Sequence, residues 1–469
     1  MSGLLSLPTE LLVEIIDAAR DYRRNGEWPP SMPYYVLQPE HVFSHVSRHL
    51  RTVVLGAPGL WTYTEVNVWD PGSVELFKMH LELSQNCNLW VIIRELTWDE
   101  ITVESQQITE ALSHLVPHAS RIQGLSIMSN PESMDAILAP FYCVEASCLE
   151  YLQIDGGDSV SGYVHAPMDI FQLGAPRLTN FKTRAFTPTP PLPNWLTSVR
   201  HLEIWRSEDD EDDDGSSVLA GIVSRCSQSL VYLHLDTLSL NDELIPSGSL
   251  RIPTLQTLHL LINYDADSAD PLVNMLSLFD VPSVTELSLI LTHGDHICAL
   301  FNNLDSLLGT TTYPSVTSLS FLTDGCGCER EEGENRPQHT PISGPPIRFF
   351  PALRSLTLFG VCFTAPILQD ILNPGPQQWP LRELAVSLSH TVEWDLSRIE
   401  ARPMDSRTQA DFDALQAVFS SLRQAVLLRR EQGQELPLFK LSGLLFREDF
   451  WVNNAVDVEL YHPPKRIEA

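Results

Sequence analysis

The first sixty residues carry apolar side chains at helical spacing in two short segments. In segment 7–20 these are Leu11, Leu12, Ile15, Ile16 and Ala19, and in segment 40–55 they are Val42, Val46, Leu50, Val53 and Val54. Segment 22–39 between them contains Gly26 and four prolines, which predicts a loop. Two short amphipathic helices cannot bury both apolar faces alone, so we expect them to pack on a further element or a partner.

From residue 121 onward the spacing changes to a recurring strand pattern, apolar-x-x-apolar-x-apolar. Its central residues are Leu125, Leu152, Phe181, Leu202, Leu233, Leu258, Leu287, Leu319, Leu356 and Leu384. They recur at a mean interval of about 29 residues, with intervals from about 21 to about 37. Five copies begin with a proline at the first strand position, where proline is tolerated: Pro176, Pro253, Pro282, Pro314 and Pro351. This pattern predicts parallel strands joined by returning segments.

The segments between and beside these strands complete the prediction. Helical spacing indicates helices over 73–84, 104–115, 215–229, 271–280 and 408–431. Strands are expected around Val66 and Val68 and over 89–93. We expect the apolar segment 436–451 to close the far end of the array and the tail 462–469 to be disordered.

The N-terminal residues resemble an F-box. Leu7-Pro8, Leu11-Leu12 and Ile15-Ile16 match the opening of that motif, and Val46-Ser47-Arg48 followed by Pro58-Gly59-Leu60-Trp61 matches its second half. The resemblance covers about 60 residues. Ser47 stands where the family usually has cysteine, His49-Leu50 stands where arginine-tryptophan is common, and segment 21–40 is longer and rich in proline.

The F-box resemblance implies docking on the small Skp-type adaptor of a cullin–RING ubiquitin ligase by packing of helices into a groove. The residues that it marks as adaptor contacts are Leu7, Pro8, Leu11, Leu12, Ile15, Val46 and Leu50. Some of these must face the internal core instead, and the sequence does not say which. The alternative is that the two helices only cap the repeat array.

The recurring strand unit resembles a degenerate leucine-rich repeat. Asn130 and Asn263 occupy the usual polar position after the strand, whereas Gly157, Leu238 and Val361 do not. The expected fold class is therefore α/β, with a short helical F-box followed by an irregular solenoid of parallel strands and outer helices. The expected divisions are 1–65 (helical domain), 66–120 (linker or capping repeats), 121–390 (repeats), 391–461 (C-terminal cap) and 462–469 (tail).

Composition narrows the expected partners. The chain has 60 acidic and 30 basic residues and a formal charge of −30. This charge disfavours nucleic acids and anionic membranes and favours a basic protein partner, although it also serves solubility alone. Eight scattered cysteines and the lack of a signal peptide indicate a reduced, cytoplasmic or nuclear protein without a membrane span.

The sequence contains no GxSxG elbow, P-loop, dinucleotide-binding fingerprint, HExxH or CxxC pair, so we expect no enzymatic activity and no cofactor. Cys326 and Cys328 with His339, and the group His293, His296 and Cys298, are too few or poorly placed for a structural zinc site, and no metal is expected there. The acidic run 208–214 after Ser207 reads as a solvated loop, or as a contact for a basic partner or an acidophilic kinase.

These expectations combine into a substrate-recognition subunit of a cullin–RING ubiquitin ligase. Its target would bind the strand face, at residues lying between the buried apolar positions. The candidates are Glu203, Tyr232, His234, Gln256, His259, Glu286, Ser318, Arg354 and Glu383. The alternatives are a protein-binding repeat scaffold without a ligase role and an enzyme of a type that the sequence does not reveal.

Overall fold

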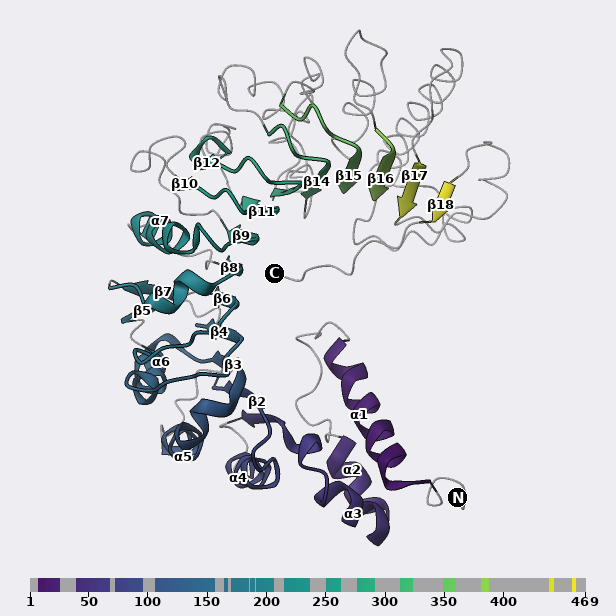
Figure 1. Cartoon of the computed structure of the whole chain (residues 1–469), viewed down its shortest axis with the longest axis vertical. Helices are drawn as coiled ribbons and strands as arrows, with labels where there is room; N and C mark the ends of the chain where they lie inside the picture. The colour runs from purple at the N-terminus through teal and green to yellow at the C-terminus, as the bar shows by residue number, and fades with distance from the viewer. Residues whose placement is uncertain are drawn as a thin grey trace, which may run out of the picture. The chain divides into compact units, whose positions relative to one another are not determined.

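The computed structural model divides the chain into two compact units, Met1–Val199 and Arg200–Ala469. It describes residues 7–25, 39–67, 72–95, 106–156, 164–167, 170–184, 186–189, 191–205, 215–236, 250–262, 276–291, 313–323, 349–359, 381–387, 438–442 and 458–460. Figure 1 labels the helices and strands.

The first unit begins with three helices, α1 (Thr9–Asn25), α2 (Pro39–Val46) and α3 (Arg48–Leu55). The prediction of one helix over 40–55 is wrong, because Ser47 interrupts it. Ser47 has an extended backbone (φ −156°, ψ 161°), and its hydroxyl oxygen accepts a hydrogen bond from the backbone N–H of Leu50 at 3.1 Å. A serine that caps a helix in this way ends α2 and starts α3. Helix α1 also continues to Asn25, past the point where the loop was expected.

The helices share two small cores. Leu12 packs with Leu50 and Val53, and Ile16 packs with Val54, Leu60 and Trp61. Trp61 ends the short 3-10 helix η2 (Pro58–Trp61), and its indole N–H donates a 2.9 Å hydrogen bond to the carbonyl oxygen of Val54. Burying the ring while pairing its one polar atom holds η2 against α3.

A parallel sheet follows in the first unit, in the order β1-β2-β3-β4-β6. Its strands are β1 (Tyr63–Asn67), β2 (Leu89–Arg94), β3 (Ile122–Met128), β4 (Tyr151–Asp155) and β6 (Asn180–Arg184). The connecting helices α4 (Ser73–Leu83), α5 (Gln106–Leu115) and α6 (Pro131–Leu138) lie on one side of these strands (Figure 1). Short 3-10 turns η3 (Val116–Arg121), η4 (Ala139–Phe141) and η5 (Asn194–Ser198) and a two-stranded ladder of β5 (Val164–Pro167) and β7 (Phe186–Thr189) complete the unit.

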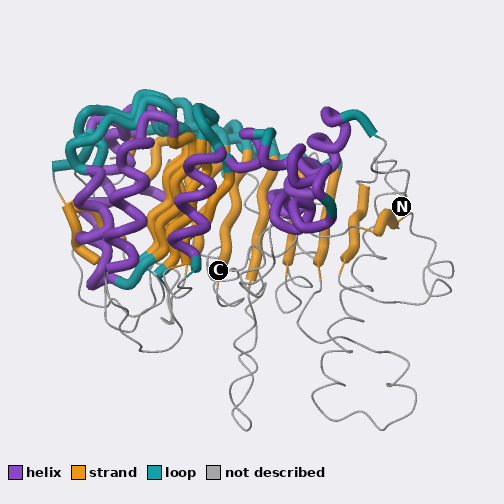
Figure 2. The backbone as a smooth tube through the Cα atoms, turned by 90° about the horizontal axis from the view of Figure 1, so that it is seen from below, coloured by secondary structure: helices purple, strands orange, loops and turns teal. Residues whose placement is uncertain are grey.

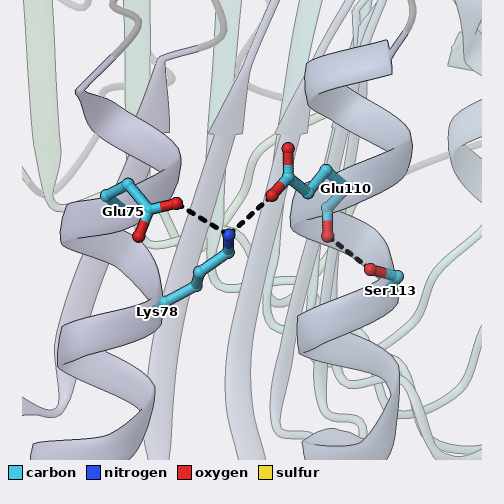
Figure 3. A network of polar contacts seen from close by, with 4 residues as sticks. All are labelled: Glu75, Lys78, Glu110 and Ser113. Carbon is cyan, nitrogen blue, oxygen red and sulfur yellow. Dashed lines mark hydrogen bonds and ion pairs between the residues drawn. The ribbon is translucent and has the colours of Figure 1, made fainter.

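Exposed ion pairs connect two of these outer helices. The Lys78 ammonium on α4 lies 2.8 Å from a Glu75 carboxylate oxygen and 2.6 Å from one of Glu110 on α5 (Figure 3). The Ser113 hydroxyl donates to the Glu110 backbone carbonyl one turn earlier in the same helix. These contacts raise the pKa of Lys78 and lower that of Glu110. Solvent screens such pairs, so they orient the helices more than they stabilise them.

The face of this sheet opposite its buried apolar residues carries an aromatic pair over a glycine. Trp90, Gly124 and Tyr151 are register neighbours on β2, β3 and β4. A Cβ atom on Gly124 would lie 2.3 Å from Cε3 of Trp90, and the Trp90 and Tyr151 ring centroids are 5.4 Å apart. Glycine is therefore required at this position for the Trp90 ring to lie over β3.

The second unit contains a parallel sheet in the order β8-β9-β11-β13-β14-β15-β16-β17-β18. The strands are β8 (His201–Trp205), β9 (Tyr232–Asp236), β11 (Thr257–Ile262), β13 (Glu286–Leu291), β14 (Ser318–Thr323), β15 (Ser355–Phe359), β16 (Glu383–Ser387), β17 (Leu438–Ser442) and β18 (Val458–Leu460). Helix α7 (Gly215–Cys226) connects β8 to β9 as expected, and Figure 2 shows the strands side by side.

The repeat register agrees with the sequence prediction inside each unit. Leu125, Leu152 and Phe181 are successive register partners in the first unit. The same holds in the second unit for Leu202, Leu233, Leu258, Leu287, Leu319, Leu356 and Leu384. All ten side chains are buried, because every second strand residue points into the core. The predicted mixed α/β fold with a large parallel sheet is confirmed.

One helix prediction within the second unit needs correction. The helix expected over 271–280 ends before Phe279, because Phe279 and Asp280 form the short strand β12, which pairs with β10 (Leu250–Arg251). The segment expected as a terminal cap contributes β17, which extends the sheet. Several predicted features lie outside the described residues: Asn263, the acidic run 208–214, the groups at 293–298 and 326–328, His339, the helix 408–431 and the tail 462–469.

Within the part of the chain that the structure describes, no helix is long and apolar enough to cross a membrane. The cysteines Cys87, Cys143, Cys148 and Cys226 are free thiols.

Candidate recognition surfaces

The N-terminal helices leave two apolar pairs in contact with water. Leu11 and Ile15 lie one turn apart on α1 and are 44% and 40% exposed. Val42 and Val46 are spaced in the same way on α2 and are 45% and 61% exposed. Exposed apolar side chains at successive turns of a helix are the usual anchors of helix-mediated protein binding.

The structure divides the seven expected adaptor contacts into an internal and an external set. Leu12 and Leu50 are 1% and 0% exposed and contact each other in the core between α1 and α3, so they are corrected to internal positions. Leu7 is half-buried and packs against the same core. The exposed residues are Pro8, Leu11, Ile15 and Val46.

In the second unit, strand register places most of the expected target-binding residues on the sheet face opposite the buried leucines. Glu203, His234, His259, Ser288 and Ser320 form one row across β8, β9, β11, β13 and β14. A second row runs through His201, Tyr232, Thr257, Glu286, Ser318, Ser355 and Glu383. Five expected residues, Glu203, Tyr232, His234, His259 and Glu286, thus occupy adjacent positions, and Ser318 and Glu383 continue the second row.

Two expected residues do not belong to these rows. Gln256 and Arg354 each lie one position before their strand begins, and their backbone N–H groups donate to Val231 and Thr317, which lie one position before β9 and β14. The strand residues that align with Tyr232 and Ser318 are Thr257 and Ser355. The sequence prediction placed the outward-facing position one residue too early at these two sites, because the alternation of side chains begins only at the first hydrogen-bonded residue of each strand.

Aromatic and imidazole rings of β8, β9 and β11 form a contiguous group, the ring cluster of His201, Trp205, Tyr232, His234 and His259. Trp205 stacks on His234 with centroids 4.0 Å apart, and His201 stacks on Tyr232 at 5.8 Å. Tyr232 and His259 meet edge to face at 5.1 Å, and the Tyr232 hydroxyl lies 3.4 Å from Nδ1 of His259. His234 is 1% exposed because neighbouring rings cover it.

Two residues of the ring cluster, Tyr232 and His259, are affected by burial and by two nearby carboxylates. Burial lowers the pKa of His259, while the nearby Glu286 and Glu203 carboxylates act in the opposite direction. Burial, then the same carboxylates, raises the pKa of Tyr232. Nε2 of His259 is buried and has no hydrogen-bond partner among the described residues. The arrangement offers π-faces and negative charge together, which is suited to a cationic side chain.

Sequence reasoning missed Trp205 and a third row, Asp236, Leu261, Ile290 and Leu322, that runs beside the row containing the histidines. The signal was present in the sequence, because Trp205 follows Glu203 by two residues, and Leu261, Ile290 and Leu322 directly follow Leu260, Leu289 and Phe321, the last apolar positions of the repeat pattern. Leu261 is buried, whereas Ile290 and Leu322 are partly exposed. The face therefore combines polar, aromatic and apolar rows.

Comparison with known proteins adds no relative. No protein-family model matches the chain, and no curated protein matches it.

Proposed function

We propose that the protein is a substrate-recognition subunit of a cullin–RING ubiquitin ligase, in which the N-terminal helices are an F-box that docks a Skp-type adaptor and the strand array is a leucine-rich-repeat-like solenoid that binds a target protein. The observation that carries the proposal is the exposed apolar pairs Leu11/Ile15 and Val42/Val46, on helices whose opposite sides are packed. Helices that already have a core but keep such pairs in water are better explained by a partner than by capping.

The strand array supports the second half of the proposal. Its register brings residues from strands about 29 positions apart into continuous rows, which is the geometry that repeat proteins use to bind other proteins. The formal charge of −30 and the carboxylates beside the ring cluster favour a basic target. In this role the chain holds a target close to a ubiquitin-loaded enzyme, so that proximity accelerates transfer and no residue here is catalytic.

Binding to the Skp-type adaptor tests the proposal directly. Wild-type protein should retain the purified adaptor, and the double variant Leu11→Asp/Ile15→Asp should lose it, because two charges would enter an apolar contact. Leu76 and Leu173 are also exposed, at 40% and 69%, and lie in the same unit. Leu76→Asp/Leu173→Asp is thus the matched control and should bind like the wild type.

Circular dichroism should show equal helix content in all three proteins, since every substituted side chain is already exposed. If wild-type protein fails to retain the adaptor, or if both double variants retain it equally, the ligase role is wrong. The N-terminal helices would then be a cap, and the protein would be a binding scaffold without a ligase role.

A further inference from the structure

A histidine pair and a buried carboxylate meet where the N-terminal helices join the first strand–helix unit. Glu40 and His41 lie in the first turn of α2, and His80 lies in the last turn of α4. Nε2 of His41 is 2.9 Å from Nε2 of His80, although the two residues are 39 positions apart. One ligand-type atom from each of Glu40, His41 and His80 lies within 4.8 Å of the others.

The orientation of His80 leaves a lone pair directed at His41. Nδ1 of His80 is 3.1 Å from the carbonyl oxygen of Tyr63, which can only accept a hydrogen bond. Nδ1 therefore carries the proton, and Nε2 of His80 is an acceptor facing His41. Histidines that bind a metal usually donate a hydrogen bond from the other ring nitrogen to a backbone carbonyl or a carboxylate.

The surroundings hold these side chains in place. Trp61 meets both imidazole rings edge to face, with centroids 5.4 Å from His41 and 5.0 Å from His80. Glu40 and His80 are 0% and 1% exposed, whereas His41 is half-buried. Burial lowers the pKa of both histidines. A carboxylate removed from water is stabilised by a nearby cation.

We propose that Glu40, His41 and His80 form a site for a borderline transition-metal ion such as Zn²⁺. Two imidazole nitrogens and one carboxylate oxygen are a set typical of a three-ligand zinc site. Magnesium and calcium prefer all-oxygen sets. The half-exposed side of His41 leaves access for a water molecule as the fourth ligand.

Within the histidine pair, the geometric adjustment needed is small. Zinc–nitrogen bonds of about 2.0–2.1 Å at a tetrahedral angle separate two nitrogens by about 3.3 Å, which requires the His41–His80 pair to open by about 0.4 Å. His41 must also move its proton from Nε2 to Nδ1, so that both Nε2 lone pairs face the ion. Since His41 is half-buried and His80 is fully buried, His41 is the less confined ring of the pair.

Such an ion would connect α2 to α4 and thereby hold the N-terminal helices against the sheet. Because a ligand that binds only the folded state stabilises it, Zn²⁺ should slow hydrogen exchange in α2 and α4 together. This consequence is independent of adaptor binding and does not rest on the proposed ligase role.

The test is Zn²⁺ titration of the full chain and of matched variants by isothermal calorimetry, with Mg²⁺ as the negative control ion. The chain has 15 histidines and eight cysteines, so other sites can contribute and the difference between variants is decisive. His41→Gln and Glu40→Gln should each bind one Zn²⁺ fewer or weaken one site more than about tenfold. His49→Ala removes an exposed histidine of α3 and should match the wild type.

Hydrogen exchange supplies a second readout that a purely structural contact would not change. Zn²⁺ should slow exchange in α2 and α4 of wild-type and His49→Ala proteins, and should leave exchange in His41→Gln unaffected. His41→Gln avoids the folding risk of replacing the buried His80. The proposal is wrong if both His41→Gln and Glu40→Gln bind as many Zn²⁺ ions as the wild type with the same affinity, or if Zn²⁺ protects neither helix.

Discussion

Leu11 and Leu12 are neighbours in the chain that the structure assigns to opposite roles, so their alanine variants should differ in kind. Leu12 is 1% exposed and packs with Leu50 and Val53, whereas Leu11 is 44% exposed. Truncating a fully buried leucine to alanine costs about 2–5 kcal/mol, through lost transfer free energy and the cavity left behind. Truncating a surface leucine changes the free energy of unfolding by less than about 0.5 kcal/mol.

Hydrogen exchange read by mass spectrometry measures this difference locally, without assuming that the whole chain unfolds in one step. With a cost of about 3 kcal/mol, Leu12→Ala should speed exchange of the protected amides in α1 and α3 by more than about a hundredfold. Leu11→Ala should change exchange by less than about threefold. The order should reverse for adaptor binding, where Leu11→Ala should weaken affinity through loss of an anchor.

Two results would refute this reasoning. Similar acceleration of exchange by both variants would mean that α1 is not oriented with Leu12 towards α3. A negligible effect of Leu12→Ala would mean that the core of Leu12, Leu50 and Val53 contributes little to holding the helices together. Either outcome would also remove the basis for dividing the expected adaptor contacts into internal and external residues.

Three further outcomes are expected. Gly124→Ala should lower the unfolding free energy of the first unit by about 1–3 kcal/mol in urea titrations, because the new methyl group overlaps the ring of Trp90, and an unchanged midpoint would contradict this. Iodoacetamide at pH 8 should label exposed Cys143 but not buried Cys226, since burial raises the pKa of the Cys226 thiol to about 12. Peptide mass spectrometry of the labelled native protein checks this, and labelling of Cys226 would contradict it. Lys78→Ala should leave the unfolding temperature nearly unchanged at any salt concentration, because its ion pairs are exposed. A large fall in the unfolding temperature would mean that these ion pairs stabilise the fold.

Much of the fold could be predicted because the residue pattern of each repeat is sufficient to predict a strand. A central leucine flanked by alternating apolar residues predicts a strand with one buried face, and ten copies at similar spacing predict that the strands lie parallel. The register follows from the same alternation, since a shift of one residue would turn every leucine to the opposite face. The pattern did not predict the first residue of each strand, so Gln256 and Arg354 were placed in strands that begin one residue later.

The sequence by itself determined that short amphipathic helices precede an array of parallel strands, because periodicity depends only on residues close in the chain. Only the tertiary structure decided which side of each helix is used internally. It turned Leu12 and Leu50 inward and Leu11 outward, since burial depends on which element packs across the helix. It also brought His41 to His80, which lie 39 positions apart and which no repeat pattern relates. Sites that require distant residues to converge therefore depend on the tertiary structure, whereas the strands that carry those residues can be predicted from the repeat pattern.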